Sequence, residues 1–266
     1  MVLAGLLAAS AAAAQQGSQP QLFITINAGA VFGGDLWTVD RQPVAIIGAP
    51  TTAPDTMRIT RRLEPGLAAG LTFTVFPWRN LGLSFEAMYL GQGVDDGCSM
   101  VYEDQDTDPQ RRNNQVCESI SGKEITAATT TFTLGGFYRF SPRGAFSPFL
   151  RAQAGISLRN ESVVEVSGFF LEQGSTAPQD RIVIPDPEGT TAGFTAALSA
   201  GIMIPISSGY SVTLEVRDHL ITMQRLLAPW DPAVSRNPQT ESYLSHAFTF
   251  TVGFSIVLER KRGRRY

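Results

Sequence analysis

Residues 247–258, AFTFTVGFSIVL, alternate large apolar side chains with small or polar ones over their whole length. The side chains of a β-strand point in turn to opposite faces, so a period of two predicts a strand with one apolar and one polar face. The apolar face of this stretch carries Phe248, Phe250, Val252, Phe254, Ile256 and Leu258. The other face carries Thr249, Thr251, Gly253 and Ser255.

Seven earlier segments repeat this alternation, which predicts eight strands in all. They cover 22–30, 67–76, 81–89, 132–140, 148–158, 194–204 and 210–220. Each has an apolar face and a face of small or polar residues. The polar faces include Thr25, Asn27, Ser84, Glu86, Thr131, Thr133, Arg139, Arg151, Gln153, Arg159, Thr195, Ser199, Thr213, Glu215, Arg217 and His219.

The connections between these segments alternate in length. Short turns lie at 77–80, 141–144 and 207–209, and long connections lie at 34–63, 94–123, 161–190 and 226–244. In a soluble barrel the polar face is wet, whereas in a membrane barrel the apolar face meets lipid and the polar face lines the lumen. Short turns at one end and long loops at the other favour the outer-membrane barrel, with both termini in the periplasm. Asp218 falls on an apolar face, which a β-bulge or a position above the membrane would explain.

The composition argues against several other classes of protein. Hydrophobic residues make up 43% and charged residues 17% of the chain, the mean hydropathy is +0.01, and the net charge is −3. Intrinsic disorder requires lower hydrophobicity and higher net charge. After the start of the chain no run of about 18 apolar residues could form a spanning helix, and the mild acidity argues against a nucleic-acid partner.

The first residues, MVLAGLLAASAAAA at 1–14, predict a secretory signal peptide. They are apolar, end in small residues and offer A-x-A cleavage sites, although no positive charge precedes them. An Ala-rich helix of the mature protein is the alternative. Export implies an oxidising compartment, in which an isolated pair such as Cys98 and Cys117 most simply forms a disulfide. A metal site is disfavoured because there is no His nearby and no C-x-x-C spacing.

In these patterns the chain resembles the small eight-stranded outer-membrane β-barrels of the OmpA/OmpX type, over residues 20–259. The resemblance implies an all-β, transmembrane, antiparallel up-and-down barrel with short periplasmic turns and long extracellular loops. Such barrels carry an insertion signal in the last strand, and Thr251, Gly253, Ile256 and Leu258 match it. The resemblance also implies contact with outer-membrane lipid and lipopolysaccharide, and with the barrel-assembly machinery during insertion.

Charged residues on the polar faces are predicted to meet inside the barrel. They are Glu86, Arg139, Arg151, Arg159, Glu215 and Arg217. The interior of an eight-stranded barrel is only wide enough to be filled by side chains, and an unpaired ion there is costly. We therefore expect the two glutamates to bridge to some of the arginines, whose guanidinium groups can donate to two carboxylate oxygens at once. A narrow polar pore is the alternative.

Two histidines are the candidates for catalysis. His219 points inward in the seventh strand and His246 begins the eighth, so the two could lie close together. Some outer-membrane barrels are lipid A deacylases or omptin-type proteases. However, Ser245 and His246 lack the spacing of the deacylase motif, and eight strands are too few for an omptin. We therefore predict no catalytic residue, cofactor or metal, with a lipid-modifying activity as the residual alternative.

Two charged segments lie outside the predicted strands. The second long connection is acidic, with Asp95, Asp96, Glu103, Asp104, Asp106 and Asp108. Pro109 stands where an EF-hand needs glycine, so an EF-hand is rejected. A solvated loop tied by the disulfide is expected, with loose divalent-cation binding beside lipopolysaccharide as the alternative. The basic tail, 260–266, either contacts anionic headgroups or is a solvated end.

The sequence thus predicts an integral outer-membrane barrel with a structural or interaction role. Its lumen would be closed by the Glu/Arg network, and its extracellular loops would form the interaction surface. A small pore or solute channel is the main alternative. A barrel enzyme that acts on lipid and a soluble periplasmic barrel are the remaining two.

Overall fold

The computed structural model describes residues 21–44, 55–103, 111–123, 125–142, 144–160, 162–186, 189, 192–207 and 209–258. The predicted signal peptide, 1–14, and the basic tail, 260–266, lie outside these residues. Among the described residues, no helix combines the length and the hydropathy needed to cross a bilayer.

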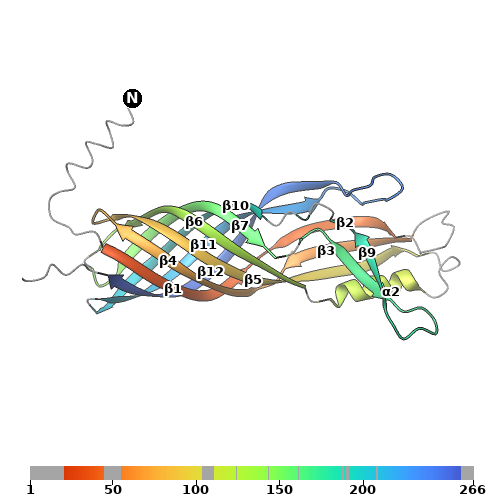
Figure 1. Ribbon diagram of the computed structural model, residues 1–266, viewed down its shortest axis with the longest axis horizontal. Coiled ribbons are helices and arrows are strands. Elements are labelled where there is room, and N and C mark those ends of the chain that lie inside the picture. The colour runs from red at the N-terminus through yellow and green to blue at the C-terminus, as the bar shows by residue number, and fades with distance from the viewer. Residues whose placement is uncertain are drawn as a thin grey trace, which may run out of the picture.

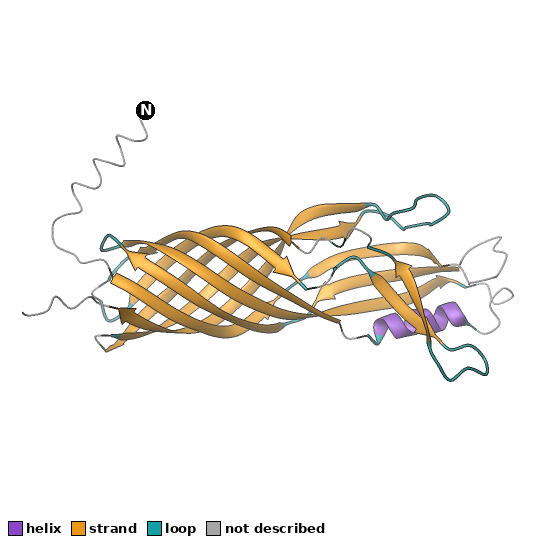
Figure 2. Ribbon diagram, viewed as in Figure 1, coloured by secondary structure: helices purple, strands orange, loops and turns teal. Residues whose placement is uncertain are grey.

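Eight antiparallel strands close into a barrel, as the alternation predicted (Figure 1, Figure 2). They are β1 (Gln21–Phe32), β4 (Gly66–Phe76), β5 (Leu81–Tyr102), β6 (Ile125–Arg139), β7 (Ser147–Arg159), β10 (Ala192–Ser207), β11 (Tyr210–Leu226) and β12 (Thr240–Leu258). Each strand pairs with its neighbours around the ring, and β1 pairs with both β4 and β12. Because the ring closes, this part of the sheet has no free edge.

The outer surface of the barrel is an apolar belt. On β12 its outward residues are Phe248, Phe250, Val252, Phe254, Ile256 and Leu258, all exposed. At a rise of about 3.3 Å per residue and a tilt of about 40°, the span from Phe248 to Leu258 is about 25 Å high. That height matches the hydrocarbon core of an outer membrane. The alternate residues of the same strand point inward and are buried.

The ladders continue without a break through Asp218. This residue lies opposite Leu198 on β10 and opposite Phe248 on β12, with no register shift at either pairing. The β-bulge proposed for Asp218 is therefore wrong. Its side chain lies on the outer face at the level of Phe248, at the end of the apolar belt, where its carboxylate lies 2.9 Å from Nδ1 of His246.

The long connections, predicted as loops, contain regular structure. β2 (Asp35–Val44) and β3 (Asp55–Leu63) join the far half of β5 in a three-stranded sheet. α2 (Arg112–Ser121) packs on β5 and on the hairpin of β8 (Val166–Phe170) and β9 (Gln179–Ile184). These elements and the far half of β5, here called the extension, project beyond the barrel, at the right of Figure 1. The prediction of loops over 34–63, 94–123 and 161–190 is therefore wrong for these elements.

The extension has its own apolar core. In β3, Met57, Ile59 and Leu63 alternate inward and are buried, because this strand also has a period of two. They join Trp37 and Val116 in a cluster that continues down into the upper lumen. Burial of side chains on both β2–β3 and α2 is what orders this part of the chain.

The side chain of Gln42 joins β2 to the chain after β11. The side-chain oxygen of Gln42 accepts the backbone N–H of Trp230 at 2.9 Å, and its amide nitrogen donates to the Trp230 carbonyl at 2.6 Å. The Gln42 amide therefore bonds to the chain after β11 as a neighbouring strand would.

A disulfide joins Cys98 on β5 to Cys117 on α2, as predicted. The two residues are 19 apart in sequence, and closing a loop of that size stabilises by about 3 kcal/mol in the chain-entropy model. We expect the double variant Cys98→Ser/Cys117→Ser to keep the barrel but to loosen α2. Limited proteolysis should then cleave the variant near α2, while the mobility shift on boiling in SDS stays. Equal protease resistance in both proteins would contradict a bracing role for the disulfide.

Candidate functional site: the barrel lumen

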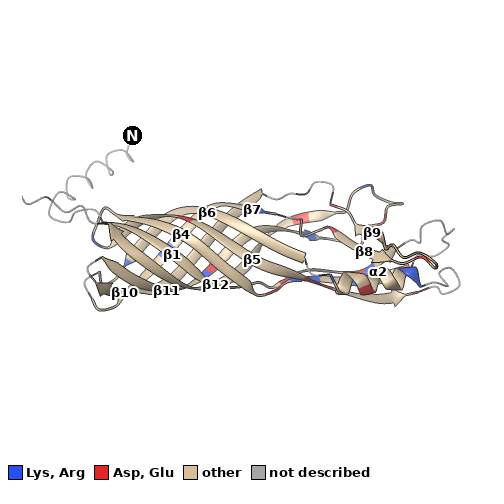
Figure 3. Ribbon diagram, turned by 60° about the horizontal axis from the view of Figure 1, so that its bottom comes forward, with Lys and Arg blue, Asp and Glu red and all other residues tan. Residues whose placement is uncertain are grey.

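Four charged residues meet at the centre of the lumen. Glu86 comes from β5, Arg151 from β7, and Glu215 and Arg217 from β11. Each carboxylate contacts both guanidinium groups, and each side chain is 3% exposed or less. Figure 3 shows that charged residues are otherwise sparse along the barrel and more frequent on the extension. We call these four residues the central network.

The central network is balanced and fully bonded at its carboxylates. Arg151 Nη1 and Arg217 Nη2 donate to Glu86 Oε2 at 2.9 and 2.7 Å. Arg217 Nη2 also donates to Glu215 Oε1 at 2.9 Å, and Arg151 donates to the other oxygen of Glu215. The hydroxyl of Thr72 adds a bond to Glu86 at 2.8 Å. Two negative and two positive groups in contact satisfy the requirement that buried charges be paired.

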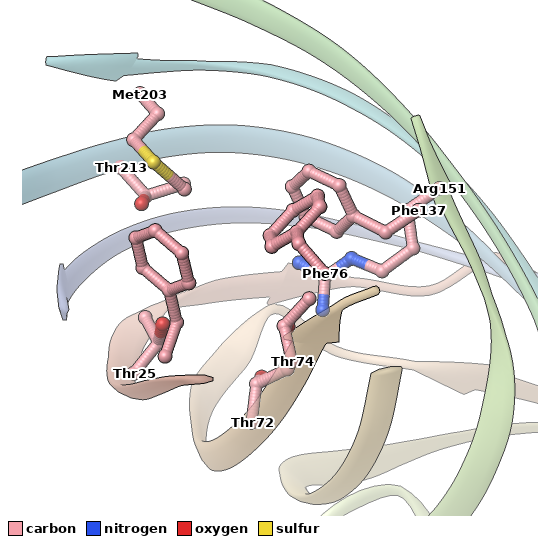
Figure 4. A pocket seen from close by; sticks show the side chains of 9 residues that line it. Thr25, Thr72, Thr74, Phe76, Phe137, Arg151, Met203 and Thr213 are labelled. Atoms are coloured by element: carbon pink, nitrogen blue, oxygen red, sulfur yellow. The ribbon is translucent and has the colours of Figure 1, made fainter. Parts of the chain in front are cut away.

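Aromatic residues fill the periplasmic half of the lumen below the network. Phe137 stacks on Phe149 at 4.6 Å and meets Phe76 edge-on at 5.3 Å, and Phe76 meets Phe23 in the same way. The guanidinium of Arg151 lies 5.5 Å from the Phe137 ring centre. The cavity among these side chains (Figure 4) is about 10 Å³. That volume is about the room needed by a single water molecule.

The extracellular half of the lumen holds apolar side chains beside polar ones. Val31, Leu90, Ile221 and Met223 are buried there and belong to the same cluster as the core of the extension. Thr195, which lies opposite Ile221, is buried at the same level. Along the described residues, the lumen thus holds an aromatic layer, the central network, and a mixed layer of apolar and polar side chains.

Arg139 and Arg159 do not join the central network. Arg159, at the end of β7, donates to the Thr222 carbonyl at 3.1 Å. Arg139, at the end of β6, donates to Gln21 Oε1 at 3.2 Å and to the Arg79 carbonyl at 3.0 Å. Of the six predicted lumen charges, the structure thus brings four together and places these two elsewhere.

The two histidines lie on opposite sides of the barrel wall. His219 is buried inside, where its Nε2 lies 3.3 Å from Thr249 Oγ1. His246 is outside, with Nδ1 2.9 Å from the Asp218 carboxylate. The expectation that the two could lie close together is wrong, because residues 219 and 246 have opposite parity in paired strands. Ser245 points inward, away from His246. Within the described ranges no cluster of three or more His, Cys, Asp and Glu side chains could hold a metal.

A second buried ion pair lies in the extension and was not predicted. Arg61 on β3 donates twice to the Asp96 carboxylate on β5, both times at 2.6 Å. Both side chains are buried, and Trp37 lies 5.4 Å from the guanidinium. The expectation of a solvated acidic loop is therefore wrong for Asp96. Its neighbour Asp95 pairs with Arg62 at the surface, and Asp104, Asp106 and Asp108 lie outside the described residues.

The residues of the proposed insertion signal divide between the two faces of β12. Thr251 and Gly253 face the lumen, and Ile256 and Leu258 face outward. A Cβ atom on Gly253 would lie 2.4 Å from Asn27 Oδ1, so a larger residue here would require the Asn27 side chain to move. The signal itself stays a prediction.

No protein-family model and no curated protein matches the sequence. Among solved structures, the fold is similar to OprG from Pseudomonas aeruginosa, at 12% identity and a TM-score of 0.49, with 90% of this chain and 96% of that chain covered. It is similar to Neisserial surface protein A at 7% identity and a TM-score of 0.42, covering 90% and 99%. It is also similar to the outer membrane protease OmpT from Escherichia coli, at 9% identity and a TM-score of 0.40, covering 91% and 99%. Identities this low concern the fold alone.

The chain's own features carry the assignment. The ring of eight strands is closed, the belt outside it is apolar, and the interior holds polar and paired charged groups. This inside-out distribution is stable only where lipid surrounds the belt. The protein is a transmembrane β-barrel of the bacterial outer membrane, with the fold of the small eight-stranded barrels.

Proposed function

We propose that the barrel is a closed anchor, and that the extension is the part of the protein that interacts with partners outside the cell. The observation that carries the proposal is the filled lumen, in which the cavity among the aromatic side chains below the central network is about 10 Å³. If the barrel does not conduct ions or solutes, its function depends on its extracellular surface. The extension supports this role because it has its own core, an ion pair and a disulfide.

Planar-bilayer recording tests the closed lumen. We expect purified protein, with a boiling-dependent mobility shift as proof of folding, to give no steady conductance steps. A reproducible channel whose size changes in Arg151→Ala would instead establish the alternative, a small pore. A mock preparation from cells that lack the protein controls for contaminating porins, since those would conduct in both samples.

Thiol labelling tests the display of the extracellular end. Both native cysteines are in the disulfide, so an introduced cysteine is the only free thiol. Val234, between β11 and β12, is 85% exposed, and Ser141 lies in the turn after β6. We expect a membrane-impermeant maleimide to label Val234→Cys on intact cells, and Ser141→Cys only after permeabilisation. The reverse pattern would overturn the proposed orientation.

The outer face of the barrel and its last strand suggest the partners at the membrane. The apolar belt contacts lipid and, in the outer leaflet, lipopolysaccharide. We infer that the barrel-assembly machinery reads the last strand through Thr251, Gly253, Ile256 and Leu258. Leu258→Asn should then lower assembly in cells but leave refolding into detergent unchanged. Equal losses in both assays would indicate a folding defect and would remove the support for a recognition signal.

A further inference from the structure

The periplasmic mouth of the barrel holds an arginine with no acidic partner among the described residues. Arg139 is 5% exposed, and its guanidinium lies 3.7 Å from the centre of the Phe76 ring. Its hydrogen bonds go to the neutral oxygens of Gln21 and Arg79, and its buried Nε has no acceptor. A buried charge without a counter-ion is costly, whereas Arg151 and Arg217 in the central network each contact two carboxylates.

A cavity of about 140 Å³ lies beside Arg139. It is much larger than the 10–15 Å³ or so that one water requires. Its walls include the hydroxyl groups of Ser147 on β7 and Ser211 on β11, which are also buried and have no hydrogen-bond partner. Among the described residues, its lining contains no aspartate or glutamate. One positively charged guanidinium and two hydroxyl groups without hydrogen-bond partners, from three different strands, therefore line the same cavity.

We propose that this cavity binds a phosphate group. A phosphate offers several oxygens around one centre, so the guanidinium and both hydroxyls can donate to it together. Arginine suits such oxyanions because its planar fork donates two parallel bonds. The bound group would supply the negative charge and the acceptor that Arg139 and its Nε lack.

The position of the cavity defines two sources of phosphate. Tyr210 lines it and is also exposed on the outer face. Aromatic residues at the end of an apolar belt mark the level of the lipid headgroups. The phosphate can therefore belong to a phospholipid of the periplasmic leaflet or be free in the periplasm. The site is independent of the extracellular interaction role, since it lies at the opposite end of the barrel.

The test is a binding titration of the folded protein in a phosphate-free sugar detergent. One arm adds inorganic phosphate, and the other adds short-chain phosphatidylglycerol. We expect saturable binding in one arm, weakened about tenfold or more in Arg139→Gln. Saturation by inorganic phosphate identifies a free anion, and saturation by the phospholipid alone identifies a headgroup. Failure of both arms to saturate overturns the proposal.

Two further variants keep the result decisive if Arg139→Gln does not fold. Ser147→Ala/Ser211→Ala removes only hydroxyls that lack partners in the free protein, so it should fold and yet bind phosphate more weakly. Arg79→Gln removes an exposed arginine at the same end of the barrel and keeps the carbonyl that Arg139 uses. It should bind as the wild type does. Equal weakening by Arg79→Gln would mean general charge attraction and would count against a built site.

Discussion

Replacing Glu86 by alanine is expected to destabilise the barrel by about 3–5 kcal/mol, the range for removing one partner of a buried ion pair. The reason is that Arg151 and Arg217 both donate to this carboxylate. After the substitution, Glu215 alone would face two buried positive charges. Urea unfolding in detergent micelles, followed by tryptophan fluorescence, measures the loss.

Two controls separate charge imbalance from loss of volume. The double variant Glu86→Met/Arg217→Met leaves Arg151 and Glu215 as one neutral pair, so it should recover most of the stability lost in Glu86→Ala. Glu241→Ala breaks the half-exposed pair with Arg225 and should cost about 1 kcal/mol or less. If the double variant is as unstable as the single one, the packing of Glu86 matters and its charge does not.

Replacing Asp96 by alanine is expected to disorder the extension and leave the barrel intact. Arg61 would be left buried beside Trp37 without its carboxylate, again at a cost of about 3–5 kcal/mol. The barrel strands do not depend on this pair, so the mobility shift on boiling should remain. Hydrogen exchange should show loss of protection in β2 and β3 with protection of β12 unchanged.

The chain offers a matched control one residue away. Asp95 pairs with Arg62 on the same two strands, but both side chains are partly exposed. Asp95→Ala should therefore change the protection of β2 and β3 very little. Similar effects of Asp95→Ala and Asp96→Ala would mean that burial of the pair between Arg61 and Asp96 does not increase its contribution to the stability of the extension.

The barrel could be predicted because apolar and polar residues alternate along each of its strands. On β12, for example, phenylalanines alternate with threonines. The phenylalanines face the lipid outside the barrel, and the threonines face the side chains inside it. The same parity put Glu86, Arg151, Glu215 and Arg217 in the lumen. Which arginine reaches which glutamate depends on the stagger between β5, β7 and β11, which residue types alone do not encode.

The extension was missed because its inward positions are not all apolar. In β3, Met57, Ile59 and Leu63 are inward, but the charged Arg61 lies on the same face, and across from it Asp96 occupies an inward place on β5. Each residue alone resembles a solvated loop residue, and only the pair is compatible with burial. Arg139 was misassigned for the opposite reason: its face was right, but its position at the end of β6 puts it beyond reach of either glutamate.

The length of β5 has a mechanical consequence. This strand runs 22 residues from the periplasmic turn into the extension, about 70 Å at about 3.3 Å per residue. It is bonded to β4 and β6 in the barrel and to β3 above it. A pull on the outer end of β5 acts along the strand. The backbone hydrogen bonds to its neighbours lie perpendicular to that direction, so they bear the load together in shear. Drag on the outer end therefore passes along one continuous strand to the lipid-embedded wall.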